Sequence, residues 1–248
     1  MVHDWENNHF LAYLLTANGL AANPIISQVG SIIEGGPANN NAAILMKFSP
    51  NGKMIVMTGY KGELVELFRF NKSTGQVSDP ISLPSHGWDW GCSFSPDNSK
   101  LYIATQDKLP FNLIHQYEVS NYDALEIINS ETFLTEADRS LGQLQIAPDG
   151  KIYLVTAYEE YLSTIHNPNA VGLNCNYEEK AIEWPFMSFF DPQWGLPNCM
   201  DFVFNESPLC DLHAYVSVTN TTCGQPNGTA TINPSGGSGD YKFSWSTG

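Results

Sequence analysis

A turn sequence that recurs three times is the feature that most constrains the fold of this chain. It reads FSPNGK at residues 48–53, FSPDNSK at 94–100 and IAPDGK at 146–151, with prolines 46 and 52 residues apart. Proline presets φ at the first turn position, and Asn, Asp and Gly tolerate the left-handed backbone of a tight hairpin. Each copy therefore predicts a β-hairpin, and the spacing predicts a unit repeated about every 40 to 50 residues.

Strand-like segments flank each turn. Short apolar lead-ins at 44–48, 90–94 and 144–146 precede the turns, and the extended runs KMIVMTGY, KLYIATQD and KIYLVTAY follow them. Two more strand-like segments come after a hairpin, as in LVELFRFN and VSDPISLP. Four short strands per repeat are typical of a β-propeller blade. The sequence therefore predicts an all-β fold with a partial β-propeller of four-stranded blades.

The repeats predict how the chain is divided. Residues 10–27, FLAYLLTANGLAANPIIS, read like the back half of a repeat, three full repeats follow, and WGLPNCMDFVFN at 194–205 closes the series. Residues 1–205 thus hold about four blades, fewer than a ring normally needs, and we expect the chain to be a fragment. A linker is predicted at 206–211. Residues 212–248 alternate at period two between Gly-rich turns, which predicts the beginning of a small β-sandwich.

Charge and hydropathy limit the partners. The chain has 26 acidic and 11 basic residues and a net charge of −15, a field that repels phosphate backbones and anionic lipids. We therefore expect no nucleic-acid partner. The longest apolar runs, such as FLAYLL at 10–15, fall far short of the roughly 18 residues of a membrane span, so no membrane insertion is expected. The opening MVHDWENN lacks signal-peptide features; either the protein is cytosolic or its true beginning is missing.

A search for catalytic motifs predicts no enzyme. The sequence contains no HExxH, GxSxG, P-loop or GxGxxG between a strand and a helix. Asp97 and Asp149 each stand alone in a hairpin turn, where side-chain capping of the backbone explains them. Four histidines are scattered over different repeats without paired ligand spacing: His86, His115, His166 and His213. We expect ordinary polar or strand roles for them, and no metal or cofactor.

The stretch HGWDWG at 86–91 is the candidate ligand or partner surface. We expect it in the connection between two blades, where such loops line one face of a propeller. His86, Trp88, Asp89 and Trp90 could stack on and hydrogen-bond a sugar ring or a protein side chain. The alternative is that Trp88 or Trp90 packs between blades, since large aromatic side chains are usually at least partly buried.

Several stretches carry a family resemblance. FSPNGK, LFRFNKSTGQVSDPISLP, FSPDNSKLYIATQ, IAPDGKIYL, YLSTIHNPNAVGLNCNY and GLPN, in this order, closely resemble the propeller of large secreted surface proteins of the Bacteroidetes. In those proteins the propeller precedes adhesin-like repeats and a gliding-motility-associated C-terminal domain for type IX secretion. The tail at 218–248 resembles the opening of an SprB repeat, an Ig-like module of gliding adhesins. Cys199 and Cys92 depart from the aromatic and apolar residues that the family has at these places.

The resemblance implies a non-catalytic protein that is extracellular or on the cell surface. The propeller would bind a carbohydrate or a protein surface, the SprB-like repeat would be an adhesive or spacer module related to gliding or adhesion, and other domains of the full-length chain would be partners. Two alternatives remain: a lactonase-class enzyme with catalytic residues in missing blades, and an intracellular scaffold. In SprB repeats a cysteine at the position of Cys223 typically pairs with one near the end of the module, which would lie beyond Gly248. The resemblance therefore implies that Cys223 lacks this partner here, although Cys210 could be captured in its place if the strands bring the two within disulfide reach.

Overall fold

The computed structural model describes residues 1–33, 44–59, 64–106, 112–137, 140–183, 195, 196, 201 and 213–235. The chain divides into a first compact unit, residues 1–205, and a second, residues 206–248. Regular structure in the described residues is β-strand apart from α1 (Ala124–Asn129) and the 3-10 helix η1 (Gly172–Cys175). Neither helix has the length and apolar character needed to cross a membrane. The predicted all-β character is confirmed.

Three four-stranded antiparallel sheets follow one another in the first unit, as the repeats predict, and their strand order is the chain order. Blade 1 contains β6 (Ile44–Phe48), β7 (Met54–Gly59), β8 (Leu64–Asn71) and β9 (Gln76–Ser82). Blade 2 contains β10 (Trp88–Phe94), β11 (Lys100–Gln106), β12 (Asn112–Glu118) and β13 (Thr132–Ala137). Blade 3 contains β14 (Leu141–Ile146), β15 (Ile152–Thr156), β16 (Tyr161–Ile165) and β17 (Tyr177–Glu183). The sheets are propeller-like blades.

A smaller N-terminal sheet precedes blade 1. It pairs β1 (Val2–His3), β2 (His9–Ala12) and β5 (Ile25–Gln28), while β3 (Leu15–Thr16) and β4 (Gly19–Leu20) form a two-stranded ribbon. This sheet occupies the place of the predicted partial repeat. Most of the predicted closing segment at 194–205 lies outside the described residues.

The recurring turns have the predicted backbone. Gly52, Asn98 and Gly150 have φ values of 64°, 66° and 76°. The backbone N–H of each donates to the carbonyl three residues earlier, at N–O distances of 2.7, 2.9 and 2.9 Å. Each turn thus reverses the chain between the first two strands of its blade, because its residues accept positive φ at little cost.

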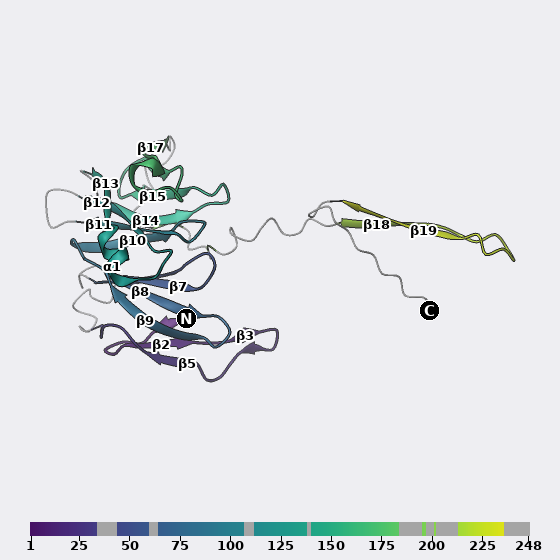
Figure 1. The fold of residues 1–248 in the computed structure, drawn as a ribbon, viewed down its shortest axis with the longest axis horizontal. Helices are drawn as coiled ribbons and strands as arrows, with labels where there is room; N and C mark the ends of the chain where they lie inside the picture. Colours follow the sequence, from purple (N-terminus) through teal and green to yellow (C-terminus); the bar gives the residue numbers. More distant parts are fainter. Residues whose placement is uncertain are drawn as a thin grey trace. The chain divides into compact units, whose positions relative to one another are not determined.

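The blades stack face to face, and blade 2 buries both of its faces (Figure 1). Alternate residues of a strand point to opposite faces, so two cores form. One face of blade 2 packs against blade 1. The buried residues on this face are Cys92, Phe94, Leu101, Ile103 and Tyr117, and those of blade 1 that meet them include Met54, Val56, Val65 and Leu67. The other packs against blade 3 and includes Tyr102, Ala104 and Ile114, against Leu144, Ile152 and Leu154. The N-terminal sheet covers the remaining face of blade 1 through Phe10.

A buried polar contact joins the first strands of blades 1 and 3. The Lys47 ammonium donates to the Leu144 carbonyl at 2.8 Å and to Gln145 Oε1 at 3.1 Å, and it lies 3.4 Å from a carboxylate oxygen of Asp201. The Gln145 amide donates to the other Asp201 oxygen at 2.5 Å. Burial raises the pKa of Asp201, against the opposing effect of Lys47. The network connects two blades that are separated by a third.

The second unit is described over one hairpin. Its strands β18 (His213–Thr219) and β19 (Thr229–Ser235) pair antiparallel along their whole length. Tyr215, Val216 and Val218 are each more than half exposed, so both faces of the hairpin carry accessible apolar side chains. The rest of the alternating pattern, including YKFSWS at 241–246, lies outside the described residues, and the sandwich remains a prediction.

Gly91 provides a test of the blade packing. A Cβ atom at this position would collide with the backbone carbonyl oxygen of Gly142, at the contact between β10 and β14. We expect Gly91→Ala to destabilise the first unit by about 3 kcal/mol or more, because a backbone oxygen cannot rotate away. Gly150→Ala is the matched control: it meets no atom within 4 Å, and its positive φ should cost only about 1 kcal/mol. If urea denaturation shows that Gly91→Ala and Gly150→Ala lose the same unfolding free energy, the close packing of blades 2 and 3 is contradicted.

Candidate functional site

The structure divides the predicted surface HGWDWG between a connection and a strand. His86 and Gly87 lie between β9 and β10, whereas residues 88–90 belong to β10, the first strand of blade 2. The prediction that the whole stretch lies in a connection is therefore wrong for Trp88, Asp89 and Trp90. The register between β10 and β11 shifts between Asp89 and Gly91, which marks a β-bulge at Trp90. Bulges of this kind re-aim side chains.

Burial separates the four predicted site residues. Asp89 is fully buried, which corrects the hypothesis that its carboxylate hydrogen-bonds a ligand directly. Trp88 and Trp90 are partly buried, so each has some accessible surface. His86 is also partly buried, with a side chain 28% exposed. A ligand could reach the two tryptophans and His86, and their role in binding stays a prediction.

Two hydroxyl groups bind the Asp89 carboxyl group. Ser85 donates to Oδ2 and Thr105 donates to Oδ1, both at 2.5 Å. Burial raises the pKa of Asp89, and these two hydrogen bonds oppose that effect. Thr105 is the cross-strand partner of Asp89 in β11, so the register of the blade creates the contact.

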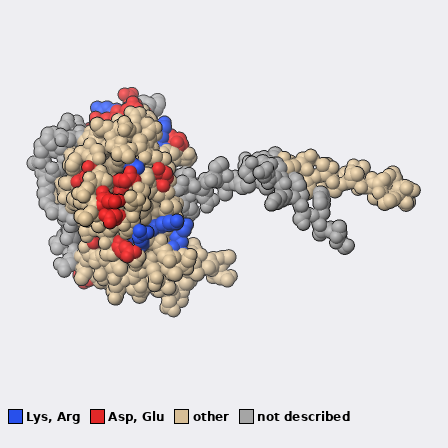
Figure 2. Space-filling model, in the orientation of Figure 1, with Lys and Arg blue, Asp and Glu red and all other residues tan. Residues whose placement is uncertain are grey.

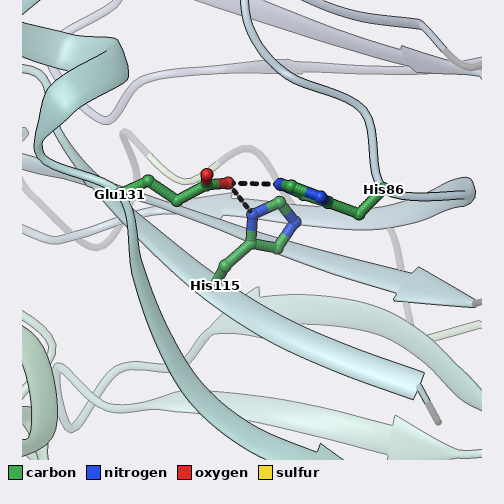
Figure 3. Close-up of side chains that lie close together, drawn as sticks. All are labelled: His86, His115 and Glu131. Carbon is green, nitrogen blue, oxygen red and sulfur yellow. Dashed lines mark hydrogen bonds and ion pairs between the residues drawn. The ribbon is translucent and has the colours of Figure 1, made fainter.

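A second carboxylate, that of Glu131, lies nearby, and one of its oxygens accepts three hydrogen bonds. Oε1 of Glu131 accepts from His86 Nε2 and from His115 Nδ1, each at 2.8 Å (Figure 3). The same oxygen also accepts from the Tyr117 hydroxyl. Burial alone would raise the pKa of Glu131, but the hydrogen bonds from His115, Tyr117 and His86 outweigh it and lower the pKa to about 2. Because a carboxylate only accepts, both imidazoles carry a hydrogen on the nitrogen that faces Glu131.

Local structure positions each member of this cluster. His115 and Tyr117 are two residues apart on β12 and therefore share a face of blade 2. Glu131 follows α1, whose cap residue Ser130 accepts a hydrogen bond from the Glu118 N–H at 2.8 Å. The capped helix thereby holds Glu131 against the end of β12. His86 reaches the same point from the connection that enters blade 2.

Thr105 links the two carboxylates through His115. Its Oγ1 lies 2.5 Å from Asp89 Oδ1 and 3.0 Å from His115 Nε2. Thr105 therefore joins the Asp89 carboxyl group and the His115 imidazole in one buried hydrogen-bond network.

Thr105, His115 and Glu131 also have the connectivity of a hydrolase triad. A hydroxyl contacts one imidazole nitrogen and a carboxylate orients the other, as in nucleophilic catalysis. Sequence reasoning missed this arrangement, because it searched for one contiguous motif. Thr105 and His115 are both completely buried, however, so the hydroxyl cannot meet a substrate in this conformation.

The description of the four histidines as scattered over different repeats is wrong for two of them, because His86 and His115 both contact Glu131. His86, His115 and Glu131 place donor atoms within 4.8 Å of one another, and imidazole and carboxylate groups bind divalent transition metals. His166 instead pairs with Glu178 at 2.7 Å, and the side chain of His213 lies outside the described part. One signal could have identified the cluster: residues 86–131 belong to one repeat, and His115 and Tyr117 share a strand face.

The remaining polar candidates have ordinary surroundings. Asp97 and Asp149 accept hydrogen bonds from the backbone N–H groups of Ser99 and Lys151, at 3.0 and 3.1 Å, which confirms their capping role. Acidic side chains are spread over the face shown in Figure 2, in keeping with the net charge of −15. An open groove of about 410 Å³ carries basic groups on blade 1 and is lined by Lys53, Arg69, Phe70, Asn71, Lys72, Ser73 and Ser78.

Comparison with known proteins gives one family match. Residues 216–248 match the SprB repeat. A search of curated proteins finds no match. The chain has low similarity to solved structures. One is a candidate 6-phosphogluconolactonase from Bacteroides uniformis, with 17% identity and a TM-score of 0.42 over 63% of this chain and 47% of that one. Another is a candidate 6-phosphogluconolactonase from Bacteroides fragilis, with 16% identity and a TM-score of 0.42 over 71% of this chain and 55% of that one. A periplasmic gluconolactonase from Pseudomonas aeruginosa is also similar (11%, 0.40, 64% and 50%). The chain spans about half the length of these proteins.

The depressed pKa of Glu131 predicts a pH dependence. Its folded value of about 2 lies below the ordinary 4.5, so its stabilising contribution is complete above pH 4.5 and is lost as the pH falls toward 2. The shift corresponds to on the order of 3 kcal/mol. Glu131→Gln should therefore be less stable than the unchanged chain at pH 7, by a margin that shrinks toward pH 3. Denaturation in the presence of EDTA measures this without a metal contribution.

Glu178→Gln is the control for that measurement. Glu178 also contacts one histidine, but its side chain is 57% exposed, so its removal should change stability by less than about 1 kcal/mol at either pH. If the unfolding free energies of Glu131→Gln and the unchanged chain differ by the same amount at pH 7 and at pH 3, the depressed pKa of Glu131 is contradicted.

Proposed function

We propose that this chain is a non-catalytic part of a secreted or cell-surface protein. In this proposal the blades form a rigid platform for a carbohydrate or protein ligand, and the SprB repeat is an adhesive or spacer module. The SprB match at residues 216–248 carries the proposal, because the repeat suggests a surface-associated protein. Type IX secretion, gliding and adhesion belong to the same proposal through the resemblance of the repeats.

The blade geometry supports a binding role. Both faces of blade 2 are buried in inter-blade cores, so strand ends and connections are what remains for a partner. Trp88 and Trp90 lie at such an end, beside a bulge and the partly exposed His86. Partly accessible tryptophans are frequent anchors in protein interfaces because they bury a large area at low entropy cost.

A hydrolase is the second candidate function, favoured by the Thr105–His115–Glu131 connectivity. Its nucleophile would have to be Thr105, whose hydroxyl is buried and already contacts Asp89. A nucleophile must approach its substrate within about 3 Å, which burial prevents. An intracellular scaffold is a third reading, and the SprB repeat argues against it.

The platform predicts a binding defect at the tryptophans. After ligands are found by glycan-array and cell-surface binding screens, Trp88→Ala and Trp90→Ala should each weaken binding about tenfold or more, as loss of an aromatic anchor does. Trp5→Ala is the matched control, since Trp5 is a partly buried tryptophan that packs at the N-terminal sheet. Thermal melts accompany each variant. If both Trp→Ala variants lose about 3–5 kcal/mol of unfolding free energy while ligand binding is unchanged, Trp88 and Trp90 are core residues and the proposed binding surface is refuted.

The non-catalytic reading predicts no turnover of generic ester, lactone or glycoside substrates. Thr105→Val, which removes the hydroxyl at nearly constant volume, distinguishes trace contamination from activity of this chain. Saturable turnover that persists through purification and disappears in Thr105→Val would establish the hydrolase instead.

A further inference from the structure

We propose that His86, His115 and Glu131 form a binding site for one Zn²⁺ ion. Their donor atoms lie within 4.8 Å of one another, and two imidazoles with one carboxylate are a common zinc donor set. The site goes beyond the proposed function and does not depend on it, since an ion could hold the blade together with or without a surface ligand.

Comparison between the blades shows that the blade architecture does not require a histidine at position 115. His115 pairs with Ile103, which faces the preceding blade. The corresponding pair on the equivalent face of blade 1 is Glu66 with Met57, and Glu66 accepts hydrogen bonds from Ser31 and Ser82. In blade 3 the corresponding pair is Ser163 with Leu154. The position thus carries a different polar group in each blade, and blade 2 alone among the three has an imidazole there.

Crowding at Glu131 points to a cation. Oε1 accepts from two imidazoles and a phenol, one donor more than its two lone pairs accommodate well. Zn²⁺ would replace the two N–H donors, because each nitrogen would present a lone pair to the metal. The imidazole hydrogens would then reside on the opposite nitrogens or be released to solvent. Tyr117 would continue to donate to the carboxylate.

Outer contacts of the kind that orient zinc ligands are already in place. His115 faces Glu131 through Nδ1, while its Nε2 contacts Thr105, which in turn contacts Asp89. Ligating histidines typically donate their second N–H to such a partner. Ligating carboxylates also accept hydrogen bonds from neighbouring groups, and here the Tyr117 hydroxyl donates to Glu131. The ring of Phe133 stacks on His115 with a centroid distance of 5.9 Å and an interplanar angle of 14°.

The geometry requires only a small adjustment. Tetrahedral zinc with bonds of about 2.0–2.2 Å separates its ligand atoms by about 3.3 Å, so the present 2.8 Å contacts would have to open by about half an ångström. His115 is fully buried and fixed on β12, but His86 belongs to a connection and is 28% exposed. Movement of His86 can therefore open the site, and its exposed side leaves a fourth position for water.

The test measures Zn²⁺ binding to the full 248-residue chain. After EDTA treatment and its removal, equilibrium dialysis with elemental analysis should give one tightly held Zn²⁺ per chain. His86→Ala and Glu131→Gln should each weaken that binding about tenfold or more, and Tyr117→Phe, which keeps all three ligands, about tenfold. His86 is partly exposed, so its variant should fold, which circular dichroism checks.

Two matched variants control the interpretation. His166→Ala removes a histidine that pairs with one glutamate at 2.7 Å and should leave zinc affinity unchanged. Cys223→Ser removes an exposed thiol that could bind zinc by itself and should also leave it unchanged. The proposal is overturned if the chain retains no Zn²⁺ at equal concentrations of metal and protein. It is equally overturned if folded His86→Ala and Glu131→Gln bind as tightly as the unchanged chain.

Discussion

Burial of both faces of each sheet is the constraint on which the first unit depends. A four-stranded sheet in which apolar residues occupy both alternating faces cannot be stable by itself, because either face left in water would lose its hydrophobic contribution. Blade 2 meets this requirement with Ile103 facing blade 1 and Tyr102 facing blade 3. Stacking therefore fixes the orientation of every blade, and through it the position of each strand end.

Local chemistry made the blades predictable. The Pro-containing turns specify where each hairpin reverses, and β7, β11 and β15 begin within a few residues after them. The register irregularity beside Asp89 was not predictable, because a bulge depends on the neighbouring blade. There β10 contacts β14 so closely that residue 91 has no room for a Cβ atom. The glycine is visible in HGWDWG, but the atom that makes it necessary is 51 residues away in the sequence.

The histidine–glutamate cluster was unpredictable for a related reason. Residues 86, 115 and 131 follow no ligand spacing. They come from a connection, a strand and the position just after the C-cap of a helix. Only the pairing of β12 with β13 and the return of the chain into blade 2 bring them together. The sequence predicted a ligand or partner surface at residues 86–90, and for His86 and the two tryptophans this stays a prediction. It misjudged Asp89, because exposure cannot be inferred from a strand whose two faces are both covered.

Polar groups buried between apolar blades cost free energy, so the members of this cluster must be hydrogen-bonded to one another. Buried carboxyl and imidazole groups lose hydration, and such a network is stable only when its members are hydrogen-bonded. Here Ser85 and Thr105 bind Asp89, while His86, His115 and Tyr117 bind Glu131. On β11 this face carries Leu101 and Ile103 toward the turn and Thr105 at the opposite end. The polar network starts at Asp89 and Thr105 and continues through His115, the cross-strand partner of Ile103, to Glu131 and Tyr117, the partner of Leu101. It therefore crosses blade 2 from the first strand to the residues before the fourth, and His86 joins it from the connection through which the chain enters the blade.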